Sequence, residues 1–183
     1  MIKKFSIFAV LALLLLPAAG LAAGAQGTAF VGSAQTLTLT DDEITWLTYM
    51  REEEKVARDV YLKMYDKYEA GIFKNIAASE QKHMDAIRKL LDKYSVPDPA
   101  AGKAIGEFTN PRLQQLYDDL IEQGGISRME AFRVGVLIEE TDIDDLNAAL
   151  ATARHNDIIA VYNNLLLGSY HHLDAFESQL ADY

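Results

Sequence analysis

The chain has 183 residues, contains no cysteine, and carries 27 acidic against 17 basic side chains for a formal charge of −10. Without cysteine there can be no disulfide scaffold, thiolate zinc site, iron–sulfur cluster or thiol nucleophile, so any metal must be held by histidine and carboxylate groups. Phosphate binding needs clustered positive charge, so the negative balance argues against nucleic acid as a partner. Half of the residues are hydrophobic, as is usual for globular proteins, and the length of the chain suits a single domain with one core.

The first 25 residues have the pattern of a secretory signal peptide. Lys3 and Lys4 come before an almost wholly apolar run, and a stretch of small residues then ends at Ala25. The apolar run is shorter than the roughly 20 residues that a membrane span needs, so an uncleaved anchor is the weaker alternative. We therefore expect an exported protein, periplasmic or extracellular, in which residues 26–40 form a flexible lead-in to a domain at residues 41–183.

Capping signals predict a first helical hairpin. Thr40 and Glu43 form a capping box, and a helix is expected from there to about Tyr68, with Gly71 as its C-terminal glycine. A second helix follows almost at once and runs to about Tyr94, where prolines end it. So short a connection makes the two helices antiparallel neighbours.

A long connection leads to a second hairpin. The connection carries one shorter helix beginning at Pro111. Ser127 then opens a helix that runs to about Thr152, and Asn156 caps a last helix that runs to the C-terminus. With no strand-like alternation, we expect an all-α fold of two hairpins joined by a long crossover, an arrangement that among four-helix bundles is typical of the ferritin-like one.

An internal repeat relates the second and last helices. His83-Met-Asp-Ala in one matches His172-Leu-Asp-Ala in the other, and Leu and Tyr follow both segments at the same offsets. Such a match in helix order supports the pairing of two similar hairpins.

Five residues of metal-ligand type interrupt the apolar stripes of the four long helices. Residues three or four apart share a helix face, and on this test the inward faces contain Glu54, Glu80, His83, Glu139 and His172. Burying unpaired carboxylates and imidazoles is costly, so positive charge should lie among them. A Glu from each of two helices with Glu-x-x-His from the others is the pattern of bundles that hold two irons or two manganese ions.

The motifs around these residues resemble the ligand helices of rubrerythrin and ferritin. More closely, the segments Met50-Arg-Glu-Glu-Glu, Ser79-Glu-Gln-Lys-His and Ile138-Glu-Glu-Thr-Asp resemble an uncharacterised ferritin-like family known only as a domain of unknown function and often exported. The likeness extends from about Asp41 to Phe176.

The resemblance implies a set of ligands and an activity. Glu54 with His83 would serve one metal, Glu139 with His172 the other, and Glu80 would bridge them. Two irons are the expected cofactor, and the expected chemistry is oxidation of Fe(II) by oxygen or peroxide, with an external electron donor for any redox cycle. Tyr61 is expected to pack beside the ligands with its hydroxyl on Glu80 or Glu139, and a redox role for it is the alternative.

One position departs from the rubrerythrin pattern. Three residues before His172, where rubrerythrin has Glu, this chain has Ser169. Asp142, Glu140 or water could complete the second metal, or the protein could hold a single metal tightly. Manganese in place of iron also stays open.

Several alternative interpretations compete with this one. Glu54 could pair with Arg58 on the helix surface, and His155 and His171 are expected to face solvent. At the level of function, the rivals are a metal-sequestering protein without turnover and a structural interaction bundle. The oligomeric state, whether monomer, dimer or larger homo-oligomer, is open.

Overall fold

Within residues 38–182, which the computed structural model describes, the chain forms five helices and no strand. The helices are α1 (Asp41–Tyr68), α2 (Gly71–Tyr94), α3 (Pro111–Gly124), α4 (Arg128–Thr152) and α5 (Asn156–Ala181). The all-α prediction is confirmed. The predicted signal peptide, residues 1–25, and most of the predicted lead-in lie outside the described residues.

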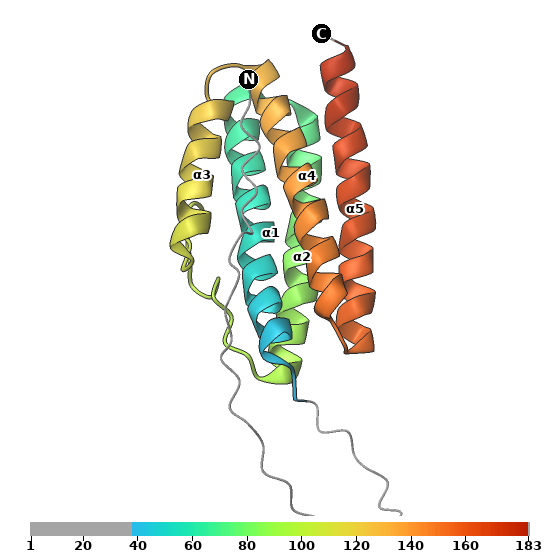
Figure 1. Ribbon diagram of the computed structural model, residues 1–183. Coiled ribbons are helices and arrows are strands. Elements are labelled where there is room, and N and C mark those ends of the chain that lie inside the picture. The colour runs from blue at the N-terminus through green and yellow to red at the C-terminus, as the bar shows by residue number, and fades with distance from the viewer. Residues whose placement is uncertain (1–37, 183) are drawn as a thin grey trace, which may run out of the picture. The chain divides into compact units, whose positions relative to one another are not determined.

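The four long helices pack around one core. α1 contacts α2 and α4, and α5 contacts the same two helices, so the four close into a ring, while α3 packs on α1 and α4. In Figure 1, α1 and α5 run in one direction and α2 and α4 in the other, so every neighbouring pair in the ring is antiparallel. The segment from the end of α2 to the start of α4 returns along the bundle, and α3 makes most of that return.

The helix ends follow the predicted capping signals, with two corrections. Thr40 and Glu43 form the expected reciprocal capping box, and Asn110 caps α3. Gly71, however, does not terminate α1: Glu69 takes the left-handed conformation there (φ 52°), and Gly71 is the first residue of α2.

The second correction concerns the start of α5, where Asn156 is not the cap. His155 occupies the cap position without a side-chain hydrogen bond. The acceptor comes instead from α1: Glu43 Oε1 accepts from the backbone N–H groups of Arg154 and His155 at 2.8 and 3.0 Å. A carboxylate distant in sequence thus satisfies amide groups at this helix end, which the local sequence leaves unpaired.

The middle of α1 is covered on all sides, so the charged residues there are buried, whereas Asp41 and Lys63 nearer its ends are exposed. Its segment Arg51–Lys55 is buried throughout, because the connection from α2 to α3 crosses it. Lys55 Nζ donates to Asp59 Oδ2 at 2.5 Å and to the Ala104 carbonyl at 2.7 Å. Glu52 accepts from the backbone N–H groups of Thr109 and Asn110. These contacts fasten the connection to α1.

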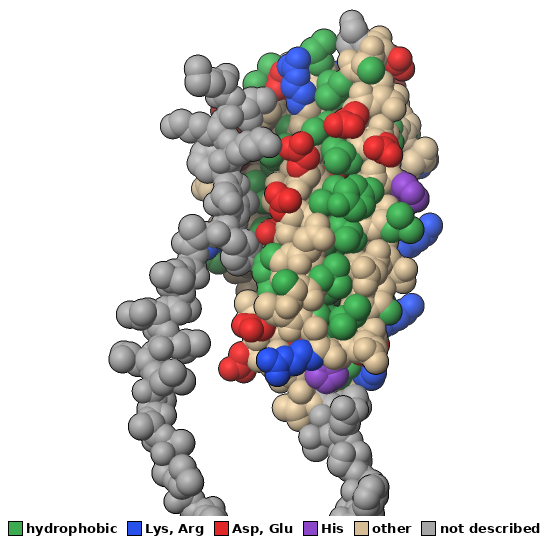
Figure 2. All heavy atoms as spheres, turned by 45° about the vertical axis from the view of Figure 1, so that its right-hand side comes forward, with side chains coloured by type: hydrophobic (Ala, Val, Ile, Leu, Met, Phe, Trp, Pro, Cys, Tyr) green, Lys and Arg blue, Asp and Glu red, His purple; other side chains and the backbone are tan. Residues whose placement is uncertain are grey.

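The outer face of α5 mixes apolar and polar side chains, and the buried polar residues of this helix lie on its inner face. Figure 2 brings the α4–α5 side forward and shows apolar side chains in a band with acidic side chains along one edge. Leu167 and Tyr170 of α5 are among the large exposed hydrophobic residues. Ser169 and His172 are buried on the opposite side of the same helix, which directs them into the bundle.

Candidate metal centre

Glu80 of α2 lies between two histidine rings. Its Oε2 is 2.8 Å from Nδ1 of His83, which follows three residues later on the same helix face. Its Oε1 is 2.8 Å from Nδ1 of His172 in α5. The two rings are roughly parallel, with centroids 5.6 Å apart. One buried carboxylate therefore spans two imidazoles from two helices.

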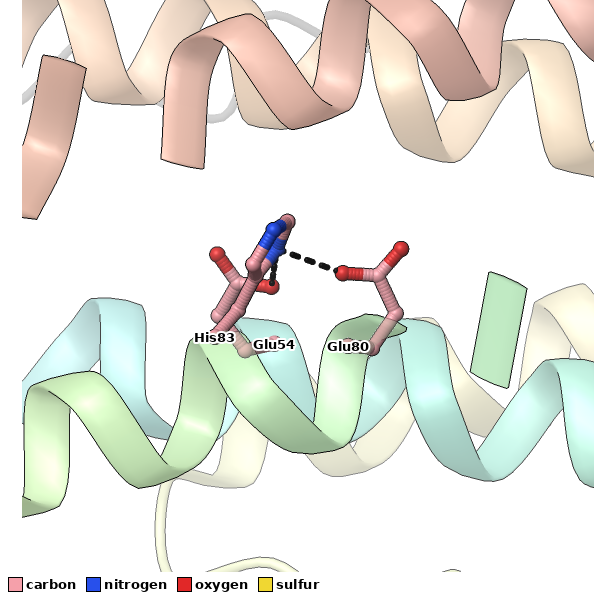
Figure 3. Close-up of side chains that lie close together, drawn as sticks. All are labelled: Glu54, Glu80 and His83. Carbon is pink, nitrogen blue, oxygen red and sulfur yellow. Dashed lines mark hydrogen bonds and ion pairs between the residues drawn. The ribbon is translucent and has the colours of Figure 1, made fainter. Parts of the chain in front are cut away.

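A glutamate from α1 completes a group around His83. Glu54 Oε2 lies 3.2 Å from His83 Nδ1. Figure 3 shows the His83 ring with both Glu54 and Glu80 directed at it. One donor atom from each of Glu54, Glu80 and His83 lies within 4.8 Å of the other two, a spacing that one cation could span.

A glutamate from α4 completes the matching group around His172. Glu139 Oε2 lies 3.5 Å from His172 Nδ1, and Glu80, Glu139 and His172 again offer donor atoms within 4.8 Å of one another. The structure thus brings together all five residues that the helix faces select, in two triads that share Glu80. Glu54, Glu80 and Glu139 are each only 2% exposed.

The donor atoms of the two triads are incompletely satisfied. Glu54 Oε1, Glu80 Oε1 and His172 Nδ1 are buried and have no hydrogen-bond partner. Glu80 Oε1 and His172 Nδ1 are 2.8 Å apart. This contact is short, but it does not have the angles of a hydrogen bond. Buried polar atoms normally have a partner, and lone pairs that converge without one suit a bound cation.

Among the described residues, lysine and arginine do not neutralise these acids. Between residues 38 and 182, no lysine or arginine forms an ion pair with Glu54, Glu80 or Glu139. Arg58, the alternative partner of Glu54, instead contacts Asp59 and Gln81. In the described part of the chain, the two histidines are the only positively charged partners of these acids.

Burial and the neighbouring charges shift the pKa of several carboxyl groups. Burial raises the pKa of Glu54 well above its usual range, with a further rise from Asp142. Burial and the charge of Glu80 raise the pKa of Glu139 to about 8. For Glu80 itself burial also raises the pKa, but the close contacts with His172 and His83 outweigh it and hold the pKa at about 2. Without a metal, the carboxylates of Glu54 and Glu139 therefore tend to bind protons.

The neighbouring carboxylates also raise the pKa of both histidine rings. Burial lowers the pKa of both rings, but the carboxylates outweigh it. Glu54 and Glu80 raise the pKa of His83 to about 11, and Glu139 and Glu80 raise the pKa of His172 to about 10. Protons thus supply the positive charge that the cluster requires.

Two further contacts hold the ligand-type side chains. The Tyr61 hydroxyl, fully buried, donates to Glu139 Oε1 at 2.6 Å, which is one of the two partners expected for it. Nε2 of His83 faces Gly168 of α5, where an added Cβ would lie only 2.7 Å away. The small residue at 168 therefore leaves room for the His83 ring.

The other acids and histidines considered as ligands differ in burial. Glu140 is exposed on α4 and does not join the cluster, whereas Asp142 is buried and accepts a hydrogen bond from Ser169 at 2.5 Å. His171 is exposed, as expected. His155 is instead half-buried, with Nδ1 2.8 Å from Glu43.

A neighbouring acidic pair escaped the sequence reasoning. Glu53 is only 5% exposed, and the Tyr49 hydroxyl lies within reach of both Glu53 Oε1 (3.4 Å) and Asp145 Oδ2 (3.1 Å). Burial and the charges of Asp145 and Asp142 raise the pKa of Glu53 well above its usual range. A single-face reading of α1 missed it, because α3 and α4 cover the side on which Glu53 lies.

No helix among the described residues is long and apolar enough to cross a membrane.

Comparison with known proteins identifies one family. An uncharacterised protein domain, DUF2202, matches residues 43–183. The uncharacterised protein MJ0754 of Methanocaldococcus jannaschii is 46% identical over 154 residues, which cover 84% of this chain and 83% of the relative. The crystal structure of hypothetical protein MJ0754 superimposes with a TM-score of 0.78 at 48% identity, over 79% of this chain and 83% of that one. The chain therefore belongs to the DUF2202 family.

Proposed function

We propose that this protein binds a pair of divalent metal ions, two irons in the native state, in a ferritin-like bundle. The observation that carries the proposal is the position of Glu80, whose two oxygens each lie 2.8 Å from a different histidine. Glu54 and Glu139 close a triad on either side. A bridging carboxylate flanked by two such triads has the donor arrangement of di-iron and di-manganese carboxylate bundles, apart from the acid that Ser169 replaces.

The kinds of donor favour iron or manganese. Carboxylate oxygen and imidazole nitrogen, with no thiolate in the chain, suit these ions. Charge agrees with the proposal, because two divalent ions would replace the protons that the cluster otherwise binds. The ferritin-like assignment is supported by the antiparallel ring and by the long return through α3.

The activity we propose is oxidation of Fe(II), the substrate, by peroxide or oxygen. Two Fe(II) ions give up one electron each, and one peroxide takes both electrons and two protons to become two waters. With oxygen as oxidant, the same two electrons and two protons yield peroxide. The chain's carboxylates and imidazoles bind and orient the metal, and a return to Fe(II) requires an external electron donor.

Export is a further part of the proposal. The basic residues, short apolar run and small-residue site of residues 1–25 support it. N-terminal sequencing of the protein produced in its host tests it, with Gln26 expected as the first residue. An N-terminus at Met1 or Ile2 would contradict cleavage.

Metal content after anaerobic Fe(II) loading and desalting tests the centre. Two irons per chain are expected in the wild type, with loss of binding in Glu80→Ala and in His83→Ala. Glu140→Gln is the matched control, because it removes an exposed acid from α4 and should bind as the wild type does. Stopped-flow addition of peroxide or oxygen then measures oxidation.

The outcomes separate the competing functions. Two irons without any oxidation would support a sequestering protein without turnover. No bound metal in a folded wild type, with variants of equal thermal stability, would refute the metal centre and favour a structural bundle.

A further inference from the structure

The two halves of the bundle differ at one position next to the histidines. In the repeat that aligns His83 with His172, Glu80 corresponds to Ser169, each three residues before its histidine. Both are buried, at 2% and 0% exposure. α2 thus contributes a carboxylate between the rings, and α5 contributes a hydroxyl at the equivalent place.

A carboxylate from α4 lies against that hydroxyl. Asp142 is three residues after Glu139, so the two share a face of α4. Ser169 Oγ, which also lies 3.0 Å from the Leu165 carbonyl of its own helix, donates to Asp142 Oδ2 at 2.5 Å. The serine therefore connects α5 to an acid on the neighbouring helix.

The second oxygen of Asp142 has no partner. Asp142 is 5% exposed, and its Oδ1 is buried without a hydrogen bond. Within the described part of the chain, neither lysine nor arginine forms an ion pair with it. A buried carboxylate with one oxygen held and one unsatisfied is costly unless a cation or proton joins it.

The charge of Asp142 acts on both triads. After burial, it is the next largest cause that raises the pKa of Glu54. It also adds to the effect of burial and Glu80 on the pKa of Glu139. Glu140, the other acid considered for this role, is exposed.

We propose that Asp142 is the fourth carboxylate of the metal centre, taking the place of the acid that α5 lacks, and that Ser169 is a positioning residue that orients it. The inference rests on the metal centre proposed above. It explains how a chain with serine at position 169 retains enough carboxylates for two divalent ions: Glu54, Glu80, Glu139 and Asp142 carry four negative charges, which match two such ions.

Isothermal titration with Mn(II) and anaerobic Fe(II), together with metal content after desalting, tests the inference. Asp142→Asn keeps the size of the side chain and an oxygen that can accept from Ser169, so the fold should be retained. We expect two ions per chain in the wild type and one in Asp142→Asn. Glu140→Gln, which removes the same charge from an exposed position of α4, should keep both ions.

The role of Ser169 is tested by a double-mutant cycle. Ser169→Ala should keep two sites but weaken the second ion about tenfold, the low end of the range for removing a hydrogen bond to a ligand. In the Asp142→Asn background, Ser169→Ala should produce no further loss of affinity. Equal effects of Ser169→Ala in both backgrounds would mean that the serine acts only through packing.

A rescue variant tests the equivalence of the two positions. Asp142→Asn combined with Ser169→Glu moves the carboxylate from α4 to α5, and we expect it to bind two ions again. A folded double variant that still binds one ion would contradict the equivalence.

The wild type and the single variant distinguish the two proposals. A wild type that binds no metal refutes the metal centre itself. A wild type with two ions and an Asp142→Asn variant with two ions of unchanged affinity leaves the centre intact and overturns the role of Asp142. A wild type that binds one ion also overturns that role.

Discussion

Gly168→Ala offers a selective perturbation of one triad, because His83 is the only described residue outside the adjacent part of α5 that the new methyl group would meet within 4 Å. The added Cβ would lie 2.7 Å from His83 Nε2 and 2.8 Å from Cε1, whereas ordinary contact begins near 3.4 Å. The ring must therefore move by about 0.7 Å, the difference between 3.4 and 2.7 Å. A metal centre tolerates displacements of about 0.5 Å.

The expected result is a loss of metal binding with little change in stability. Overpacking costs about 1–3 kcal/mol, and replacing glycine by alanine inside a helix regains about 1 kcal/mol. The net loss in the free energy of unfolding should thus be about 0–2 kcal/mol. The affinity for the ion held by Glu54 and His83 should fall at least about tenfold.

Gly135→Ala is the matched control. Its Cβ would lie 2.6 Å from the ring of Phe176, which packs against Tyr61 and Phe73 with centroids 5.2 and 5.7 Å apart. The overlap is similar but falls on the aromatic core, so we expect lower stability and an unchanged two ions per chain. Thermal melts and titration with Mn(II) measure both quantities.

Two results would refute this reasoning. A Gly168→Ala variant that binds both ions with wild-type affinity would show that the position of His83 does not control binding. Equal losses of metal in Gly168→Ala and Gly135→Ala would show that general loosening of the bundle is responsible.

The remaining predictions concern charge inside the bundle. The raised pKa values of Asp142 (about 7), Glu139 (about 8), His172 (about 10) and His83 (about 11) mean that the metal-free fold binds more protons than the unfolded chain. Its melting temperature should therefore fall by about 5 °C or more between pH 6 and 9 and should change much less once metal is bound; a flat metal-free profile would contradict the shifts. Burial raises the pKa of Glu43, but hydrogen bonds from Thr40, Arg154 and His155 outweigh it and hold the pKa at about 2. The stabilisation from the Glu43 carboxylate is thus complete above about pH 4.5 and is lost as the pH falls toward 2. Glu43→Gln should therefore lower the free energy of unfolding by about 2 kcal/mol at pH 7 and by almost nothing near pH 2. Urea unfolding at both pH values measures this difference. Lys55→Met leaves the fully buried Asp59 with Arg58 as its remaining cation. The free energy of unfolding, measured in urea, should fall by about 2–3 kcal/mol, and the metal content should not change. An unaltered urea midpoint would show that Lys55 does not stabilise the connection.

Local sequence alone determined the helices of this protein. Caps at Thr40, Asn110 and Ser127 and the periodicity of apolar residues depend on neighbours within a few positions, so the bounds of α1 to α5 follow closely from them. The same periodicity placed Glu54, Glu80, His83, Glu139 and His172 on inward faces. A helix face is set by residue spacing, and spacing can be read without knowing which helices meet.

Only the tertiary structure decided what meets those faces. That Glu80 spans both histidines, that Asp142 rather than Glu140 points inward, and that Ser169 holds it all depend on how α2, α4 and α5 face one another. Periodicity selects only Glu54 from the charged run Arg51–Lys55, yet all five residues are buried, because the return connection crosses α1. Contacts between residues far apart in sequence depend on how the helices pack against one another, and no local sequence pattern specifies that packing.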